Sequence, residues 1–388
     1  MLNNKYVVKS LTPWMMDELI AFSSMSNFDL ILLRVPTNFY KEGLNKLNLN
    51  GVNIYIKPIS YKFSIRKLIV ILKFIANNFL KFNINYNAVL GIKSIFWFFK
   101  LDVRYFTGES NIHAQFATQA ALVSLLVKYY YSNKPLLSFT FHAYDIYFSN
   151  NWFNLLVKNS HKAFSISLFN IKYVKNNFID SDRVFLSRLG VFRNLIQKHD
   201  KNDSNFFVLG LMSWFVEKKG INYLLEAIKE LKANDYKDIK LILAGDGPLK
   251  DKYLKYIEEN DLTSMIEYRG KVKGQEKENF YNEIDCFILP SIRLKNDQDG
   301  IPVVLMEAIA YRLPLISTNV SGIPEICIND YNGKLINDRD VKSNYDSIVE
   351  IYNDKTKRLL FANNSYDISK EYDIEFNSKK KLMNLNWI

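Results

Sequence analysis

The stretch Asp299-Gly300-Ile301-Pro302-Val303-Val304-Leu305-Met306-Glu307 joins a loop to an apolar helix and decides how this sequence is interpreted. Pro302 stands near the first helical position, where its fixed φ suits a helix and its missing N–H loses no hydrogen bond. The free N–H groups and the positive dipole end of such a helix start favour a bound anion. Asp299 precedes the helix and Glu307 lies inside it, so the two carboxylates can reach opposite ends of one extended ligand.

The composition is that of a soluble globular protein with two domains. The sequence has 388 residues, of which 48% are hydrophobic and 23% are charged, and such a chain is too long for a single core. Cys286 and Cys327 each lie in an apolar run, which predicts buried thiols in a reducing compartment. The cysteines and the four histidines show no zinc-type spacing, so we predict no metal. Without a signal peptide or a bilayer-spanning apolar run, a cytoplasmic protein is expected.

Positive charge is concentrated in the first half of the chain. Residues 1–200 hold 24 Lys and Arg against 10 Asp and Glu, whereas residues 201–388 hold 27 against 30, which together give the net charge of +11. Residues 57–104 alternate basic side chains with apolar and aromatic runs. The basic residues of its first part are Lys57, Lys62, Arg66, Lys67 and Lys73.

This mixture suits peripheral docking of residues 57–104 on an anionic membrane, at the inner face of the plasma membrane. The alternative is an ordinary helix core with a solvated basic face. Nucleic-acid binding is disfavoured because no nucleic-acid motif accompanies the charge.

Short apolar runs alternate with helical stretches, which predicts two α/β domains with largely parallel sheets. A polar segment at 194–204 separates them, so we place an N-terminal domain at 1–195 and a C-terminal domain at 205–370. Ten of the fourteen glycines lie between Gly190 and Gly333, which indicates tight turns and a nucleotide site in the second domain. Predicted strands include Ala88–Ile92, Val103–Thr107, Cys286–Leu289 and Leu315–Thr318.

Three segments resemble motifs of one enzyme family. The paired acids of Asp299–Glu307 resemble the signature of the retaining, nucleotide-sugar-dependent glycosyltransferases of family 4. Ser213-Trp214-Phe215-Val216-Glu217-Lys218-Lys219-Gly220 is similar to that family's Gly-Arg-Leu-Val-Glu-Lys-Lys-Gly, and Thr140-Phe141-His142-Ala143-Tyr144-Asp145 is similar to its Thr-x-His-Gly-x-Asp. The resemblance implies the GT-B fold, in which two Rossmann-like domains face each other across a cleft. It also implies that a C-terminal helix, here 371–388, crosses back to the N-terminal domain.

The resemblance also implies roles for particular residues. The catalytic residues are expected to be Lys219 on the donor diphosphate, Asp299 on sugar hydroxyls and His142 on the donor sugar from the first domain. Glu307 is expected on the ribose and the backbone of Val272 on the base. The backbone expected on phosphate and sugar belongs to Gly300, Ile301, Pro302, Val303 and Val304. This scheme requires no cofactor and no metal.

Several positions depart from the family pattern. Trp214 stands where the family has an arginine on the diphosphate, and Lys218 and Arg293 are the candidates to replace that charge. Asp299 is one methylene shorter than the family's glutamate. Gln115 replaces the second histidine of a His-Ala-His-Phe element, and we interpret it as structural.

The resulting hypothesis is a hexosyltransferase-type enzyme that moves a sugar from a UDP- or GDP-sugar to a lipid-linked or growing oligosaccharide acceptor. The basic first domain points to surface polysaccharide assembly, such as capsule, O-antigen (lipopolysaccharide) or exopolysaccharide. Two alternatives stay open. One is a sugar-nucleotide epimerase or phosphorylase, and the other is a non-catalytic GT-B subunit of a transferase complex, which the Trp214 and Asp299 departures would favour.

Overall fold

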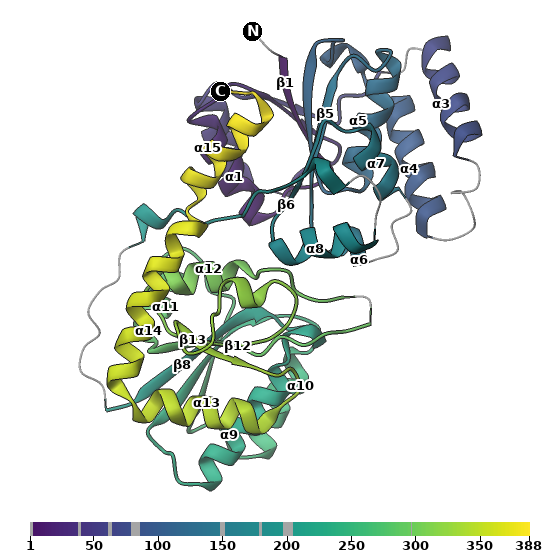
Figure 1. Cartoon of the computed structure of the whole chain (residues 1–388). Helices are drawn as coiled ribbons and strands as arrows, with labels where there is room; N and C mark the ends of the chain where they lie inside the picture. Colours follow the sequence, from purple (N-terminus) through teal and green to yellow (C-terminus); the bar gives the residue numbers. More distant parts are fainter. Residues whose placement is uncertain are drawn as a thin grey trace. The chain divides into compact units, whose positions relative to one another are not determined.

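The computed structural model describes residues 3–37, 40–60, 64–78, 86–147, 152–177, 181–196, 205–295 and 297–388. The chain forms two compact units (Figure 1). Unit 1 comprises Met1–Leu189 and Ile374–Ile388, and unit 2 comprises Gly190–Asp373. Within the described residues, no helix is both long and apolar enough to cross a membrane.

Unit 2 begins earlier than the polar segment that was expected to mark the boundary, and residues 197–204 of that segment lie outside the described residues. The reason lies in two contacts with the end of unit 2. The N–H of Val191 donates to the C=O of Tyr372 at 2.9 Å. Arg193 Nε donates to Ser369 Oγ at 2.8 Å.

Unit 1 is built, within the described residues, on seven parallel strands in the order β3-β2-β1-β4-β5-β6-β7. The strands are β1 (Asn3–Val8), β2 (Asp29–Leu32), β3 (Asn53–Ile56), β4 (Ser110–Gln115), β5 (Leu136–Phe141), β6 (Lys162–Ser165) and β7 (Val184–Leu186). The helices are α1 (Pro13–Ser23), α2 (Lys41–Leu49), α3 (Ile65–Asn77), α4 (Tyr86–Lys100), α5 (Gln119–Tyr130), α6 (Ala143–Tyr147), α7 (Phe153–Asn159), α8 (Leu168–Asn177) and α15 (Ile374–Leu385). The predicted parallel α/β architecture is therefore confirmed for this unit.

Two predicted strands of unit 1 are wrong. Ala88–Ile92 belongs to α4, because a short apolar run does not by itself distinguish a strand from a buried helix. Val103–Thr107 instead begins with a short 3₁₀ helix, Val103–Tyr105, whose first residue follows the cap Asp102. The strand that was expected there begins at Ser110.

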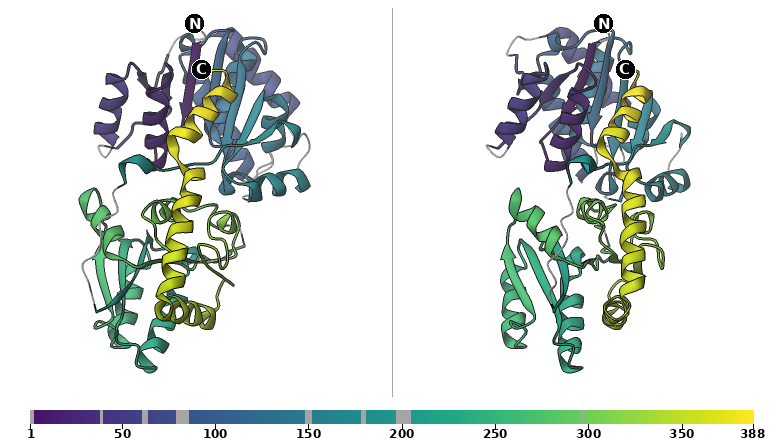
Figure 2. Two further views of the ribbon diagram at one scale, coloured as in Figure 1. Left: turned by 60° about the vertical axis from the view of Figure 1, so that its left-hand side comes forward. Right: turned by 90° about the vertical axis from the view of Figure 1, so that its left-hand side faces the viewer.

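The sheet of unit 1 buries apolar side chains on both faces, as parallel sheets do. Successive residues of β1 show this: Val7 packs with α5 residues on one face, whereas Tyr6 and Val8 pack with α1 on the other. Helix α15 covers this second face beside α1, as the yellow and purple ribbons show in Figures 1 and 2. Trp387, just beyond α15, stacks on Phe28 with ring centroids 6.1 Å apart.

Unit 2 contains, within the described residues, six parallel strands in the order β10-β9-β8-β11-β12-β13. The strands are β8 (Phe207–Trp214), β9 (Ile239–Asp246), β10 (Ile266–Gly270), β11 (Cys286–Leu289), β12 (Leu315–Thr318) and β13 (Gly333–Ile336). The helices are α9 (Ile221–Ala233), α10 (Lys250–Glu259), α11 (Gln275–Glu283), α12 (Val303–Ala310), α13 (Val341–Asn353) and α14 (Lys355–Ile368). This is a second Rossmann-like unit, as predicted, and both cysteines are buried free thiols.

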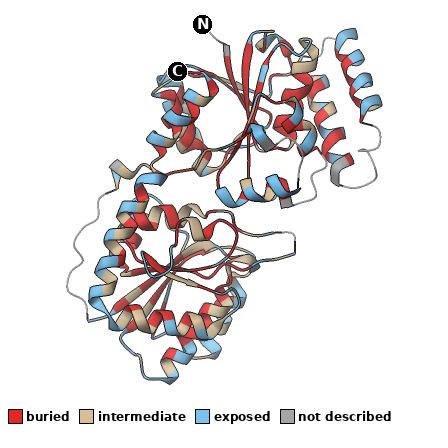
Figure 3. Cartoon of the chain, viewed as in Figure 1, coloured by how far each residue is buried: buried red, intermediate tan, exposed pale blue. Residues whose placement is uncertain are grey.

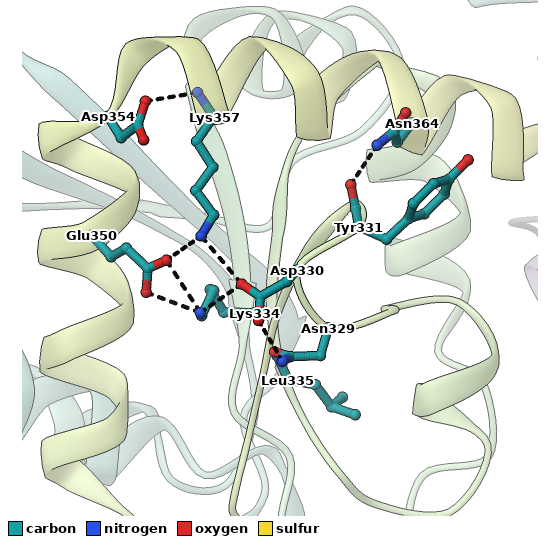
Figure 4. A network of polar contacts seen from close by, with 9 residues as sticks. All are labelled: Asn329, Asp330, Tyr331, Lys334, Leu335, Glu350, Asp354, Lys357 and Asn364. Atoms are coloured by element: carbon teal, nitrogen blue, oxygen red, sulfur yellow. Dashed lines mark hydrogen bonds and ion pairs between the residues drawn. The ribbon is translucent and has the colours of Figure 1, made fainter.

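A polar cluster fastens the last strand of unit 2 to its last two helices (Figure 4). Lys334 of β13 lies 2.8 Å from Asp330 and 2.9 Å from Glu350 of α13. Lys357 of α14 lies 3.2 Å from Asp330 and 2.5 Å from Glu350. Because two cations alternate with two carboxylates, each charge has two opposite neighbours, which makes the cluster worth more than an isolated surface pair.

Candidate active site

Two loops meet at the carboxyl edge of the unit 2 sheet. β8 and β11 are neighbours, but the chain continues from β8 to one side of the sheet and from β11 to the other. Such a reversal of strand order is where open α/β sheets bind ligands. The N–H of Ile292, after β11, donates to the C=O of Lys218, after β8, at 2.8 Å. The two loops are therefore held together at the point where a ligand is expected.

Gly220 allows this approach of the two loops. Its φ is 63°, and a Cβ added there would lie 1.9 Å from the carbonyl oxygen of Pro290. Only glycine fits this position without moving the backbone. The close contact places Lys219 beside the loop that carries Asp299.

Lys219 and Asp299 form a nearly buried ion pair. Lys219 Nζ lies 2.9 Å and 2.7 Å from the two carboxylate oxygens of Asp299, and Ser291 Oγ donates to Asp299 Oδ2 at 2.7 Å. Lys218 pairs with Asp297 at 2.9 Å and lies 3.8 Å from Asp299. Two ammonium groups therefore surround one carboxylate.

The protonation of Asp299 follows from this environment. Burial alone would raise the pKa of its carboxyl group. The charges of Lys219 and Lys218, with the hydrogen bonds from Lys219 and Ser291, outweigh burial and lower the pKa below its usual value. Asp299 is therefore ionised at neutral pH and can accept hydrogen bonds from hydroxyl groups.

Glu307 is held in α12 by two side chains of α11. Lys277 Nζ lies 2.7 Å from Glu307 Oε1, and Tyr281 Oη donates to Glu307 Oε2 at 2.7 Å. Burial and then the charge of Glu307 raise the pKa of Tyr281 well above its usual value, so the phenol keeps its proton. A carboxylate has about four lone-pair sites, so Glu307 can still accept hydrogen bonds from a diol.

The start of α12 lies between these two carboxylates in the sequence. Pro302 is the N-cap residue, and within the described residues no side chain caps this end. The loop residue Ile301 is buried, whereas Val303 and Val304 are half-buried. The N–H groups of the first turn therefore point out of the helix end as an anion site.

The position of the missing family arginine is exposed. Trp214 is 53% exposed at the end of β8, and Lys271, which precedes Val272 after β10, lies 5.5 Å from the centre of its ring. Arg293 donates instead to the C=O of Asn319. Of the two candidates to replace the arginine charge, Lys218 is the one beside Asp299. Lys271 is a third cation at this sheet edge; its segment, Arg269–Val272, was singled out for the backbone of Val272, and no role was predicted for the Lys271 side chain.

His142 follows β5 at the carboxyl edge of the unit 1 sheet. Its ring lies between Trp14 and Phe116, with centroids 4.9 Å and 4.6 Å away, and its backbone N–H donates to Asp145 Oδ2 at 2.8 Å. Burial, with a smaller contribution from the charge of Lys381, lowers the pKa of His142 to about 3. Burial raises the pKa of Asp145 to about 7 against two backbone hydrogen bonds. His142 is therefore neutral at pH 7.

The structure brings Lys219, Asp299, Glu307 and the residues 300–304 to one edge of unit 2, whereas His142 lies in unit 1. Sequence reasoning missed the residues that hold the two acids. Lys277 and Tyr281 stand four positions apart on one face of α11, a spacing that could have indicated a shared contact. Ser291 belongs to Leu289-Pro290-Ser291, which resembles a Leu-Pro-Ser run of the family, but nothing in that run indicated its contact with Asp299.

The protein thus combines two parallel α/β units with a candidate ligand site at the carboxyl edge of the unit 2 sheet, and its similarity to known proteins adds to this description. The profile of the family described as Glycosyl transferases group 1 matches residues 191–368. The whole chain superimposes on a crystal structure of Anabaena HepE in complex with UDP and glucose, with a TM-score of 0.70, 14% identity and 100% coverage of both chains.

Curated relatives carry names of the same kind. An uncharacterised glycosyltransferase of Methanocaldococcus jannaschii is 28% identical over 69% of this chain and 72% of its own length. The putative colanic acid biosynthesis glycosyltransferase WcaL of Escherichia coli is 34% identical over 33% of this chain and 31% of its own length. An Escherichia coli UDP-Gal:α-D-GlcNAc-diphosphoundecaprenol α-1,3-galactosyltransferase is 26% identical over 52% of this chain and 54% of its own length. Residues 191–368 thus match the Glycosyl transferases group 1 family, and the chain has a fold of the GT-B type, with two Rossmann-like units.

Proposed function

We propose that the protein is a retaining glycosyltransferase of surface polysaccharide biosynthesis that uses a UDP- or GDP-sugar and a lipid-linked or growing saccharide acceptor. The observation that carries the proposal is the grouping of Lys219, Asp299, Glu307 and the α12 start at one sheet edge. The names of the relatives support it, because they include colanic acid biosynthesis and a UDP-Gal-dependent transferase that acts on a diphosphoundecaprenol-linked sugar.

Each group of a nucleotide sugar has a complementary group in unit 2. Lys219 and the N-terminus of α12 offer positive charge to a diphosphate. The ionised carboxylate of Asp299 accepts hydrogen bonds from sugar hydroxyls, and Glu307, in the helix interior, accepts from the ribose diol. We expect the backbone of Val272, just beyond β10, to bind the nucleotide base.

The chemistry that we propose depends on stabilising the leaving group. As the sugar–phosphate bond breaks, negative charge grows on the diphosphate, and Lys219 with the α12 dipole stabilises that charge. The acceptor hydroxyl then attacks from the side that the diphosphate leaves, and its proton passes to the departing phosphate oxygen. This route requires neither a strong base nor a metal ion, because the protein supplies position and charge.

Donor binding is the first test. UDP-, GDP-, ADP- and CMP-sugars are compared for their effect on the thermal unfolding midpoint. We expect one UDP- or GDP-sugar to raise the midpoint, because a ligand that binds only the native state stabilises it by about 2.7 kcal/mol at 100 times its Kd. Glu307→Gln is expected to lose most of that shift, since the neutral amide accepts weaker hydrogen bonds from the ribose.

Glu258→Gln is the matched control, because Glu258 is exposed on α10. It is expected to keep the full shift. A chain that shows no shift with any nucleotide sugar would contradict the proposal and favour the non-catalytic subunit. A chain that converts a free sugar nucleotide without an acceptor would favour the epimerase.

The proposed membrane contact rests on α3 and α4. The described part of residues 57–104 exposes two apolar stripes, and Figure 3 shows exposed positions along α3. The α3 stripe consists of Ile65, Leu68, Ile69 and Leu72, and the α4 stripe of Val89, Ile92, Phe96 and Phe99. Lys67 does not belong to this surface, because its buried ammonium group donates to the C=O groups of Phe99 and Leu101 at 3.0 Å and 2.5 Å.

A basic groove adjoins the α3 stripe. A cavity of about 670 Å³ is lined by Arg66, Ile69 and Lys73 of α3 together with Lys158 in the last turn of α7. The described lining includes no acid. Arg66 also stacks over Tyr130, with its guanidinium carbon 4.7 Å from the ring centre. An anionic lipid headgroup fits this charge while acyl chains cover the stripe.

Binding to vesicles tests this contact. We expect the protein to sediment with phosphatidylglycerol vesicles more than with phosphatidylcholine vesicles, and Arg66→Gln/Lys73→Gln to lose most of the difference. Each surface charge contributes about 1 kcal/mol, so the two changes should weaken binding roughly 30-fold. Lys229→Gln/Lys252→Gln removes two exposed charges from unit 2 and serves as the control. If both double variants sedimented equally with the phosphatidylglycerol vesicles, the proposed membrane contact would be ruled out.

A further inference from the structure

A chain of buried polar side chains connects α15 to His142 within unit 1. Lys381 Nζ lies 2.7 Å from Glu18 Oε1, and Tyr6 Oη donates to Glu18 Oε2 at 2.7 Å. The carboxamide of Gln115 lies with its Oε1 3.0 Å from Tyr6 Oη and its Nε2 3.1 Å from His142 Nε2. All five side chains are buried. The contacts join segments that are up to 363 positions apart in sequence.

The number of protons available to these five side chains decides which group donates and which accepts in each hydrogen bond. An ionised Glu18 only accepts, so it takes one proton from Lys381 and one from Tyr6. Burial, followed by the charge of Glu18, raises the pKa of Tyr6 well above its usual value, so the phenol stays protonated. Its single proton is used by Glu18. The oxygen of Tyr6 can therefore only accept a hydrogen bond from Gln115.

The carboxamide of Gln115 must then turn its NH₂ group to Tyr6 and its C=O group to His142. Nitrogen and oxygen of a carboxamide are alike in size, so a half turn exchanges them at the same two positions. In the opposite orientation Tyr6 would need a second proton. With the C=O group facing His142, the ring nitrogen Nε2 must carry the proton.

We propose that Gln115 is a positioning residue that fixes His142 as the neutral Nε2–H tautomer. Nδ1 is then the nitrogen that accepts a hydrogen bond from a sugar hydroxyl. The role in transfer rests on the function proposed above, whereas the tautomer does not. The orientation originates in the Glu18–Lys381 pair, so a residue of α15 specifies which ring nitrogen of His142, just after β5, carries the proton. If Glu18 were protonated, Gln115 would keep the opposite orientation and His142 would carry its proton on Nδ1.

Nitrogen NMR of the free protein tests the tautomer directly. Protein labelled with ¹⁵N-histidine is recorded at pH 7, and the two ring nitrogens of His142 are assigned by their loss in His142→Asn. A protonated and a bare imidazole nitrogen resonate in well separated regions. We expect Nε2 in the protonated region and Nδ1 in the bare region, and a protonated Nδ1 would overturn the proposal whatever the enzyme's activity.

Variants test the positioning role. In Gln115→Leu, His142 loses the hydrogen bond that fixes its tautomer, and in Tyr6→Phe, Gln115 loses the hydrogen bond that orients it. In both variants we expect the two ring nitrogens of His142 to show chemical shifts averaged over the two neutral tautomers. Transfer should fall about 3- to 10-fold, the worth of one hydrogen bond. Gln119→Leu also buries a leucine in place of a buried glutamine of unit 1 and should leave both readouts unchanged.

The outcomes separate this proposal from the proposed function. If Gln115→Leu keeps both the wild-type tautomer and the wild-type rate, Gln115 is not a positioning residue. If the wild-type protein binds no nucleotide sugar, the proposed function fails, and the nitrogen spectrum still decides the tautomer. Tyr6→Phe keeps the test usable if Gln115→Leu does not fold.

Discussion

Lys219→Met is expected to lower kcat/KM for sugar transfer by about 100- to 1,000-fold, the range seen when one preorganised group that stabilises developing charge is removed. The reason is that Lys219 is the cation closest to Asp299 and lies beside the anion site at the α12 start. Steady-state rates with the donor that shifts the unfolding midpoint provide the measurement.

Lys218→Met is the matched control for this prediction. Lys218 is the neighbouring lysine, but it pairs with Asp297 and stands farther from Asp299. We expect it to lower kcat/KM much less than Lys219→Met. Similar losses in both variants would show that the two ammonium groups act as one diffuse charge. In that case Lys219 would have no special role, contrary to the prediction.

Gly220→Ala is expected to destabilise unit 2 by about 2–4 kcal/mol, because it adds overpacking to a left-handed backbone conformation. The added Cβ would lie 1.9 Å from the Pro290 carbonyl oxygen. Gly270→Ala is the control. Its φ of 65° is close to that of Gly220, and the nearest atom to an added Cβ is Tyr268 Oη at 3.9 Å, an ordinary contact. It should lose only about 1–2 kcal/mol from the backbone.

Hydrogen exchange of unit 2 peptides, followed with increasing denaturant, measures both glycine variants separately from unit 1. The Gly220 variant should also lose donor binding, because Lys219 is moved with the loop. If the two alanine variants were equally stable, the close approach of the loops after β8 and β11 would not exist in the native protein.

The sequence predicted unit 2 better than unit 1 because the decisive information there is local. Cys286–Leu289 and Leu315–Thr318 were predicted with the bounds that β11 and β12 have. Each is a short apolar run that breaks at a proline, an acid or an asparagine. Ala88–Ile92 is one residue longer and is also apolar, yet it forms part of α4, which packs against α5. Only the tertiary fold distinguishes these cases.

The candidate site shows the same difference between what local sequence indicates and what only the tertiary fold determines. The acids of Asp299–Glu307 could be recognised because their spacing lies within one loop and one helix. Lys277 and Tyr281 reach Glu307 from another helix, and Gln115 reaches His142 from another strand. Such contacts depend on which helices and strands become neighbours in the folded protein. Gln115 was interpreted as structural for the same reason. The role proposed for it can be inferred only from its contacts with Tyr6 and His142.

The return of α15 to unit 1 has a consequence for how the protein is made. On the ribosome, residues up to 189 emerge first, but the Lys381–Glu18 pair and the Trp387–Phe28 stack need residues 374–388. Unit 2 is a continuous segment, Gly190–Asp373, and can complete its folding while it is synthesised. Translation of unit 1 thus begins before that of unit 2 but is completed after it, and until residues 374–388 are made Phe22 and Phe28 lack their contacts with Trp387.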